Sequence, residues 1–281
     1  MSLLKDFFSR FLIAVFFSVT GLFLAWYSRF TLFVLISSFV LLGLREYASL
    51  VERGGSRPMR LSGYALGLFF MTTGYLGPLS LQHHAVVIAV GALVALKAVH
   101  LNWDAHRDTV NDLILTLFGS LYVGGALSFI MNLRTIHEMR FDVVTHRDYL
   151  FLLPFIGAWA GDTGAYIAGN LLGREKIDAE LSRGKTVEGF IGGMASGFAA
   201  IYIFGSVLRF PVILSVAMGI IVPLVGTAGD LFESALKRRF AVKDSGTFFH
   251  SHGGVLDRFD SVFFALPVVY FLVYYFYIYR T

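Results

Sequence analysis

The sequence predicts an all-α, polytopic integral membrane protein, and its composition and the spacing of its charged residues are the basis of that prediction. The chain has 281 residues, 56% of them hydrophobic, and its mean hydropathy is +0.70. Soluble globular domains are only about 45–50% apolar. Stretches free of Asp, Glu, Lys and Arg recur at lengths near the roughly 20 residues that a helix needs to cross about 30 Å of hydrocarbon. No polar linker separates two cores, so residues 1–281 are expected to form a single membrane domain.

Nine helices fit the uncharged stretches, although totals of eight or ten stay open. The second stretch is short, since Arg29 and Arg45 bracket only fifteen uncharged residues, and the fourth contains Lys97. Long basic side chains near a helix end can reach the interface, so both stretches are kept. The first stretch is longer than the apolar region of a signal peptide and is expected to be a mature helix. The expected spans are 11–28, 30–47, 62–79, 84–101, 111–132, 149–172, 189–208, 211–235 and 259–279.

The distribution of Lys and Arg predicts the orientation of these helices, because short cytoplasmic loops carry an excess of both residues. With nine spans and the N-terminus inside, 17 of the 23 Lys and Arg residues fall on the cytoplasmic side. The loops 173–188 and 236–258 are then both cytoplasmic and can meet. We therefore expect a multi-pass protein of the cell (inner) membrane with a polar cavity open to the cytoplasm. The formal net charge of +4 is small, and no nucleic-acid partner is expected.

The two halves of the chain differ in their polar content. Residues 1–148 carry no dense polar motif, so they are expected to form a scaffold, with a homodimer as a further expectation. Residues 149–281 hold the charged motifs and are expected to be the catalytic part. Glu46 beside Arg45 is expected to form an ion pair at the membrane interface. The alternative is that its carboxylate reaches the cavity from the second span.

Two motifs precede the main polar region. Asp162 is a carboxylate within the sixth span, where an unpaired charge costs about 2.5–3.5 kcal/mol on insertion scales. It is either satisfied within a helix-packing face or part of a site. The segment 182–193 leads into a Gly-rich helix, where free backbone N–H groups together with Lys185 and Thr186 would suit a phosphate group. Taken alone, this segment fits an ordinary cytoplasmic loop equally well.

The densest polar region lies between the last two spans. Asp230, Ser234 and Lys237 recur at helical spacing at the end of the eighth span. Asp257 and Asp260 are three residues apart and share a face at the start of the ninth. Mg²⁺ prefers such carboxylates together with waters and substrate phosphates. A zinc site is disfavoured because the chain has no HExxH motif and no cysteine.

These residue types together indicate phosphoryl or nucleotidyl transfer. The carboxylates would hold a hard cation, the Lys and Arg side chains would neutralise phosphates, and the glycines would allow close backbone approach. In such reactions positioning and charge neutralisation supply most of the catalysis. Because the motifs lie at the predicted cytoplasmic face of the membrane, one substrate is expected to be a soluble nucleotide and the other a lipid.

The last polar region resembles the signature of the phosphatidate cytidylyltransferases, also called CDP-diacylglycerol synthases. The matched positions are Ser234-Ala-Leu-Lys237-Arg238-x4-Lys243-Asp244-x-Gly246-x5-His252-Gly253-Gly254-x2-Asp257-Arg258-x-Asp260. Similar pieces of that family are Gly161-Asp162-Thr163-x-Ala165-Tyr166 and Ser182-x2-Lys185-Thr186-x-Glu188-Gly189. The resemblance covers most of the second half of the chain. Arg183 and His250 stand where the family commonly has proline.

The resemblance implies transfer of CMP from CTP to phosphatidate, which yields CDP-diacylglycerol and pyrophosphate in phospholipid biosynthesis. It implies Mg²⁺ and also K⁺ as cofactors, and CTP, phosphatidate and the lipid bilayer as partners. The expected cation ligands are Asp230 and Asp257, followed by Asp260 and Asp162. The residues expected to act in catalysis are Asp230, Lys243, Asp244, His252, Asp257, Arg258 and Asp260. The residues expected to bind substrate are Asp162, Lys185, Thr186, Ser234, Lys237, Arg238, Gly253 and Gly254.

Two other functions stay open. A CTP-dependent lipid or polyprenol kinase would share a cytoplasmic Mg²⁺ and CTP site but would transfer the γ-phosphoryl group. A secondary transporter would use an intramembrane carboxylate as an ion site near the midplane, between broken helices. The full signature argues against the kinase. The clustering of carboxylates at the cytoplasmic ends of the spans argues against the transporter.

Overall fold

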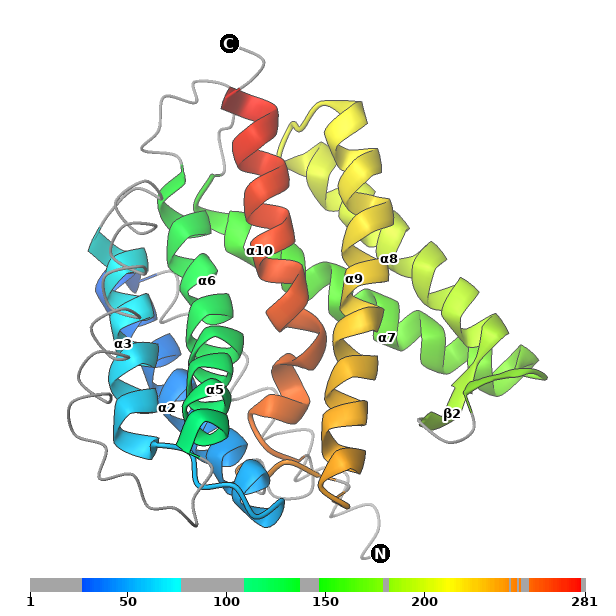
Figure 1. Cartoon of the computed structure of the whole chain (residues 1–281). Helices are drawn as coiled ribbons and strands as arrows, with labels where there is room; N and C mark the ends of the chain where they lie inside the picture. The colour runs from blue at the N-terminus through cyan, green and yellow to red at the C-terminus, as the bar shows by residue number, and fades with distance from the viewer. Residues whose placement is uncertain are drawn as a thin grey trace, which may run out of the picture.

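The structure is a computed structural model that describes residues 27–76, 109–136, 147–178, 182–242, 244–246, 248 and 253–278. Almost all of these residues are helical, as the sequence predicts, and Figure 1 shows how the helices are arranged. The elements in chain order are α2 (Arg29–Arg53), α3 (Arg60–Leu76), α5 (Thr109–Gly119), the π-helix η1 (Ser120–Gly125), α6 (Ala126–Thr135), the 3-10 helix η3 (Arg147–Leu152), α7 (Leu153–Leu172), β1 (Lys176–Asp178), β2 (Ser182–Thr186), α8 (Val187–Val207), α9 (Val212–Arg239) and α10 (Leu256–Ile278).

Six helical segments of the described residues are long and apolar enough to cross a membrane. They confirm the helices predicted at 30–47, 111–132, 149–172, 189–208, 211–235 and 259–279. α3 is also helical within the predicted span 62–79, but it has only 17 described residues. The predicted spans 11–28 and 84–101 lie outside the described residues, apart from Tyr27 and Ser28. The total of nine spans therefore stays a prediction.

α10 lies between two groups of helices (Figure 1). One group contains α2, α3, α5 and α6, and the other contains α7, α8 and α9, with α7 crossing obliquely behind α9 and α10. α10 contacts α9 most extensively and also touches α6, α7 and α2. Its residues Val262, Leu266 and Val269 are fully buried in the hydrophobic core. The two groups of helices therefore meet on α10, whose first turn carries part of the signature.

The π-helix η1 interrupts the long helix that α5 and α6 would otherwise form. Such distortions often occur at functional sites. A Cβ added at Gly124 of η1 would lie 2.6 Å from the Cα of Gly67, so η1 and α3 are in direct backbone contact. On the other side, the ring of Tyr122 packs against Phe232 of α9 and Phe263 of α10. η1 thus joins the N-terminal helices to the two helices that carry the signature.

Small residues allow α7 and α8 to pack closely. A Cβ added at Gly193 would lie 2.9 Å from the carbonyl oxygen of Gly161. The Ser196 hydroxyl also donates across the interface to the carbonyl oxygen of Ala160 at 2.8 Å. Helices in a membrane associate through such close contacts and interhelical hydrogen bonds, because lipid tails are as apolar as leucine. Large apolar side chains on the other faces are exposed, as lipid contact requires, among them Trp159, Ile191 and Ile203.

A β-hairpin joins α7 to α8, where the sequence predicts only a polar loop. β1 pairs antiparallel with β2, with Lys176 opposite Thr186 and Asp178 opposite Ser182. The fold is otherwise helical in the described residues, so the all-α prediction needs only this correction. Strands of three and five residues are too short for an alternating pattern to distinguish them from a loop. The hairpin positions the start of α8, because Thr186 ends β2 and is also the N-cap of α8.

The connections that carry the charged motifs lie on one side of the molecule. α9 ends and α10 begins at the lower edge of Figure 1, where α2 ends and α3 begins, and the hairpin lies toward the same edge. The ammonium group of Lys185, in β2, lies 2.5 Å from the carboxylate of Asp230, in α9. The hairpin therefore meets α9 at Asp230, within the predicted span 211–235, and a contact between the loops 173–188 and 236–258 stays a prediction.

We predict that Gly124→Ala lowers the melting temperature of the protein in detergent. The new methyl group would collide with the backbone of α3, which cannot rotate away, and overpacking of this kind costs about 1–3 kcal/mol. The matched control is Gly63→Ala at the same interface, where the nearest atom to the new Cβ would be 3.7 Å away. An unchanged melting temperature for Gly124→Ala would show that η1 and α3 do not pack in this way.

Candidate functional site

A cavity of about 300 Å³ lies among α7, α8, α9 and the start of α10. Glycines from α7, α8 and α9 line it and leave space that larger side chains would fill. Pro223 also lines the cavity and interrupts the hydrogen bonds within α9, because proline has no N–H to donate. The charged and polar side chains of the lining are those of Asp162, Tyr166, Lys185, Thr186, Thr227, Asp230 and Ser261.

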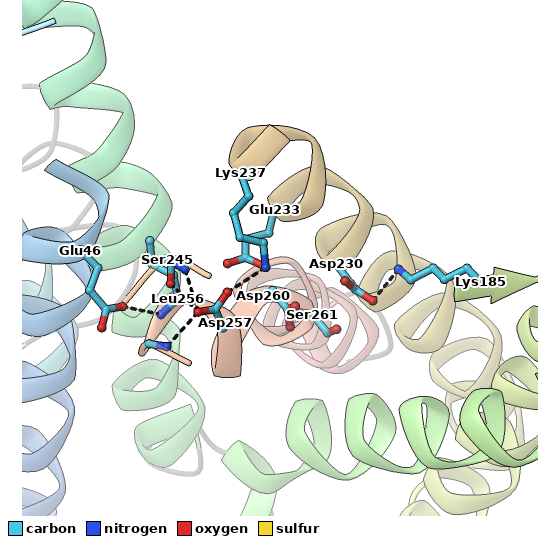
Figure 2. Close-up of polar contacts among 11 residues, drawn as sticks. Glu46, Lys185, Asp230, Glu233, Lys237, Ser245, Leu256, Asp257, Asp260 and Ser261 are labelled. Atoms are coloured by element: carbon cyan, nitrogen blue, oxygen red, sulfur yellow. Dashed lines mark hydrogen bonds and ion pairs between the residues drawn. The ribbon is translucent and has the colours of Figure 1, made fainter. Parts of the chain in front are cut away.

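An ion pair and two further carboxylates give this cavity its charge. Lys185 Nζ lies 2.5 Å from Asp230 Oδ2, and the two side chains are only 25% and 28% exposed (Figure 2). Asp162 and Asp260 lie close enough to Asp230 to interact with it electrostatically. Lys185 acts on Asp230 and Asp162, whereas the ammonium group that acts on Asp260 is that of Lys237. The cluster as a whole is acidic and would attract a further cation.

These carboxylates fit a magnesium ion that is held in part by its substrate. Mg²⁺ is commonly bound by one or two protein carboxylates, with waters and substrate phosphates as its other ligands. Asp162 and Asp230 offer oxygen ligands on the cavity wall, and Asp260 is near. Within the described part of the chain, no three His, Cys, Asp or Glu side chains are close enough to form a metal site by themselves. The residues therefore fit a cation site that nucleotide phosphates complete.

Backbone N–H groups at the start of α8 are partly used by the protein itself. Thr186 Oγ1 accepts a hydrogen bond from the N–H of Gly189 at 3.1 Å, and the N–H of Val187 donates to the carbonyl oxygen of Glu175 at 2.9 Å. The prediction of free N–H groups is therefore wrong for Val187 and Gly189. The cause is local, since threonine is a favourable N-cap and the hairpin brings Glu175 alongside. Thr186 lines the cavity, and its role toward substrate stays a prediction.

A second polar cluster joins α9 to α10. Lys237 Nζ lies 2.7 Å from Glu233 Oε2 and 2.8 Å from Asp257 Oδ1. The side chains of Glu233 and Asp257 are only 1% and 10% exposed, so each depends on the ammonium group to compensate its charge. Asp260 lies between this cluster and Asp230 in Figure 2. The role of Lys237 toward substrate stays a prediction. In the structure its Nζ pairs with two carboxylates of the protein.

Asp257 also fixes the loop before α10. Its Oδ2 accepts hydrogen bonds from the N–H of Gly254 at 2.8 Å and from Ser245, whose N–H and hydroxyl lie at 2.9 and 2.8 Å. Gly253 has a φ of 79°, which favours glycine, and a Cβ there would lie 2.7 Å from the same oxygen. With Lys237 at Oδ1, both oxygens of Asp257 have partners within the protein. Its role as a metal ligand stays a prediction.

The other predicted residues lie near these clusters or outside the described residues. Besides the residues of the second cluster and Asp260, four further described residues do not line the cavity: Ser234 and the exposed Arg238 in the last turns of α9, the exposed Asp244 in the loop, and the exposed Arg258 in the first turn of α10. Lys243 and His252 lie outside the described residues. The structure therefore brings Asp162, Lys185, Thr186 and Asp230 together at the cavity, and Lys237, Gly253, Gly254 and Asp257 at the second cluster.

Comparison with known proteins places this site in a family. The sequence profile of the cytidylyltransferase family matches residues 8–276. The chain belongs to the cytidylyltransferase family. The phosphatidate cytidylyltransferase of Bacillus subtilis (strain 168) is 35% identical over 167 residues, which are 59% of this chain and 60% of that protein. Those of Staphylococcus aureus (strain COL) and Staphylococcus haemolyticus (strain JCSC1435) are 35% identical over 190 and 187 residues, in each case 65% of this chain and 68% of the relative.

One residue of this cytidylyltransferase-family site lies far from the signature. Glu46 of α2 is predicted to pair with Arg45, but it is only 9% exposed and accepts a hydrogen bond from the N–H of Leu256 at 3.0 Å (Figure 2). The predicted ion pair is wrong because successive residues on a helix point about 100° apart and do not face each other. The alternative, that Glu46 reaches the cavity, is also not what the structure shows, because the carboxylate points inward to the start of α10 and is not part of the cavity lining. The available signal was an acidic residue in an otherwise apolar span.

We predict that Lys237→Met destabilises this cytidylyltransferase-family protein strongly. Removal of the ammonium group leaves Glu233 and Asp257 as buried, uncompensated charges, a loss of about 3–5 kcal/mol. The double variant Lys237→Met, Glu233→Gln should recover part of this loss, because one of the unpaired charges is gone. Thermal unfolding in detergent measures both.

The control for this prediction is Lys185→Met. The Lys185–Asp230 pair is more exposed than the pairs of Lys237, so its loss should lower the melting temperature by less. Equal melting temperatures for Lys237→Met and Lys185→Met would contradict the assignment of Lys237 as the buried link between α9 and α10.

Proposed function

We propose that this member of the cytidylyltransferase family is a phosphatidate cytidylyltransferase, which transfers CMP from CTP to phosphatidate and yields CDP-diacylglycerol and pyrophosphate. The observation that carries the proposal is the pair of Lys185 and Asp230 at a cavity of about 300 Å³, in a chain of this family. Nucleotidyl transfer needs carboxylates for a cation beside basic groups for phosphates. The names of the Bacillus and Staphylococcus relatives support phosphatidate as the acceptor.

In the proposed reaction, a phosphate oxygen of phosphatidate attacks the α-phosphorus of CTP. A bond forms between that oxygen and the α-phosphorus, and the bond from the α-phosphorus to the oxygen bridging to the β-phosphate breaks. The electron pair leaves on pyrophosphate. No strong base is needed, because a phosphate monoester with a second pKa of about 6 is already largely ionised near neutral pH. Lys185 and Thr186 are assigned to bind phosphate oxygens at the cavity.

The proposed cations are Mg²⁺ and also K⁺. Asp162, Asp230 and Asp260 would hold Mg²⁺, with substrate phosphates as its other ligands. When bound, Mg²⁺ supplies positive charge that stabilises the transferring phosphoryl group and the leaving pyrophosphate. Asp257 is a further candidate ligand, and its hydrogen bonds with Ser245 and Gly254 would then have to rearrange. Lys243 and His252 keep their predicted roles toward phosphate.

The proposed orientation places the site at the cytoplasmic face of the cell (inner) membrane. Basic side chains gather on the side of the described structure where the site lies, and short cytoplasmic loops are rich in such residues. They come from α2, β1, β2 and α9, namely Arg53, Lys176, Lys185, Lys237, Arg238 and Arg239. Residues 1–148 would then serve as a scaffold, and as the contact surface of a homodimer.

We predict that a thiol at position 239 reacts only from the cytoplasmic side. The sequence contains no cysteine, so Arg239→Cys and Arg209→Cys each introduce a single thiol, at exposed positions on opposite ends of α9. A membrane-impermeant maleimide added to intact spheroplasts should label the Arg209→Cys variant and not the Arg239→Cys variant, and inverted vesicles should reverse the pattern. Labelling of the Arg239→Cys variant in intact spheroplasts would overturn the orientation.

The function is tested by following isotope from CTP into lipid. Purified protein in detergent, given phosphatidate, Mg²⁺ and CTP labelled at the α-phosphate, should form a labelled lipid with the mobility of CDP-diacylglycerol. Label placed at the γ-phosphate should appear only in pyrophosphate. Entry of γ-label into lipid would identify a CTP-dependent lipid kinase, and no product with phosphatidate or any other lipid would favour a transporter.

The matched variants for this assay are Asp230→Asn and Glu52→Gln. Asp230→Asn keeps the shape of the side chain but removes the carboxylate from the cavity, and a fall in kcat of about 100-fold or more is expected. Glu52→Gln removes a charge from an exposed pair with Arg60 outside the cavity and should leave kcat unchanged. Full activity of Asp230→Asn would contradict the assignment of the cavity as the site.

A further inference from the structure

Glu46 brings a buried carboxylate from α2 to the start of α10, 210 residues later in the sequence. Its Oε2 accepts a hydrogen bond from the N–H of Leu256 at 3.0 Å, and the N–H of Val255 is a second donor to the carboxylate. The first N–H groups of a helix have no partner within the helix. A negative charge at this end is also favoured by the helix dipole. Glu46 therefore caps α10 from a different helix.

The loop before α10 is shaped around this carboxylate. A Cβ added at Gly246 or Gly254 would collide with the carboxylate of Glu46. Both glycines belong to the signature. The Ser245 hydroxyl is also within hydrogen-bonding range of Glu46, and it lies 2.8 Å from Asp257 Oδ2. The two ends of the loop, at Gly246 and Gly254, therefore both rest against one side chain of α2.

The same loop carries the contacts of Asp257. Ser245 and Gly254 donate to Asp257 Oδ2, while Asp257 Oδ1 accepts from Lys237 of α9. Any shift of Ser245 or Gly254 would therefore change the hydrogen bonds that hold the carboxylate of Asp257. Glu46 and Asp257 hold opposite sides of one short piece of backbone (Figure 2).

We infer that Glu46 is a positioning residue for the transfer reaction, acting through Ser245, Gly246 and Gly254 on Asp257 and the start of α10. The inference rests on the proposed function for its effect on turnover, but its structural part stands on the hydrogen bonds alone. Among the described residues, those that hold the carboxylate of Glu46 are not part of the cavity lining, so it acts on geometry rather than on substrate. It also gives the N-terminal half of the chain a defined role in the site.

The test compares Glu46→Ala and Glu46→Gln with Glu52→Gln, which removes the same charge from the same helix near its end. Turnover is measured per folded molecule with labelled CTP and phosphatidate. Glu46→Ala should lower kcat by about 10-fold to 100-fold with a smaller change in KM, because backbone donors lose their acceptor and the loop shifts. Glu46→Gln should lie between Glu46→Ala and wild type, since one oxygen acceptor remains. Glu52→Gln should match wild type.

Hydrogen–deuterium exchange gives a readout that does not depend on activity. The peptide that contains Val255 and Leu256 should exchange about tenfold faster in Glu46→Ala. Its exchange rate in Glu52→Gln should equal that of the wild type. If the wild-type protein makes no CDP-lipid, this result still supports the positioning role while the proposed function fails. Unchanged exchange in Glu46→Ala overturns the inference. If the wild-type protein is active, an unchanged kcat in Glu46→Ala also overturns it. If Glu46→Ala does not fold, Glu46→Gln supplies both measurements.

Discussion

The ammonium group of Lys237 joins the end of α9 to the start of α10, and the rest of the site depends on that contact. Two buried carboxylates, Glu233 and Asp257, face it from the two helices. A buried carboxylate without a cation would be strongly destabilising, so α9 and α10 are held at one distance and one register at this end. Asp230 and Asp260 lie one to two turns further along the same pair of helices. Their separation is therefore set by the same ion pairs.

The cavity exists because glycines of α7, α8 and α9 line it, where larger side chains would fill the space. α7 and α8 approach so closely that Gly161 and Gly193 are in backbone contact, and a third helix, α9, closes the space where Pro223 and Gly226 line it. Lipid gives no hydrophobic gain for helix association, so close packing and hydrogen bonds such as that of Ser196 hold these helices together. The polar cavity is thus compatible with large exposed apolar side chains on the outer faces.

Much of the fold and part of the site follow from the sequence. Helices can be predicted from uncharged stretches because a span needs about 20 apolar residues. The distribution of Lys and Arg over the loops also predicts that Lys185 and the polar region with Asp230 lie on the same side, and the two residues are in contact. The hairpin is not readable, since strands of three and five residues give no periodic signal. The N–H of Val187 is not free because the hairpin brings Glu175 alongside, whereas the N–H of Gly189 bonds to the N-cap Thr186, only three residues earlier.

Glu46 shows why a signature is not a self-contained site. From the sequence, the glycines at 246 and 254 of the signature are expected only to allow close backbone approach. In the structure both are the positions where the carboxylate of a distant helix comes against the loop. The first N–H groups of a helix have no partner within the helix, so that of Leu256 needs an acceptor from elsewhere, and α2 supplies it. In this chain the two glycines therefore leave room for a residue that the signature does not contain.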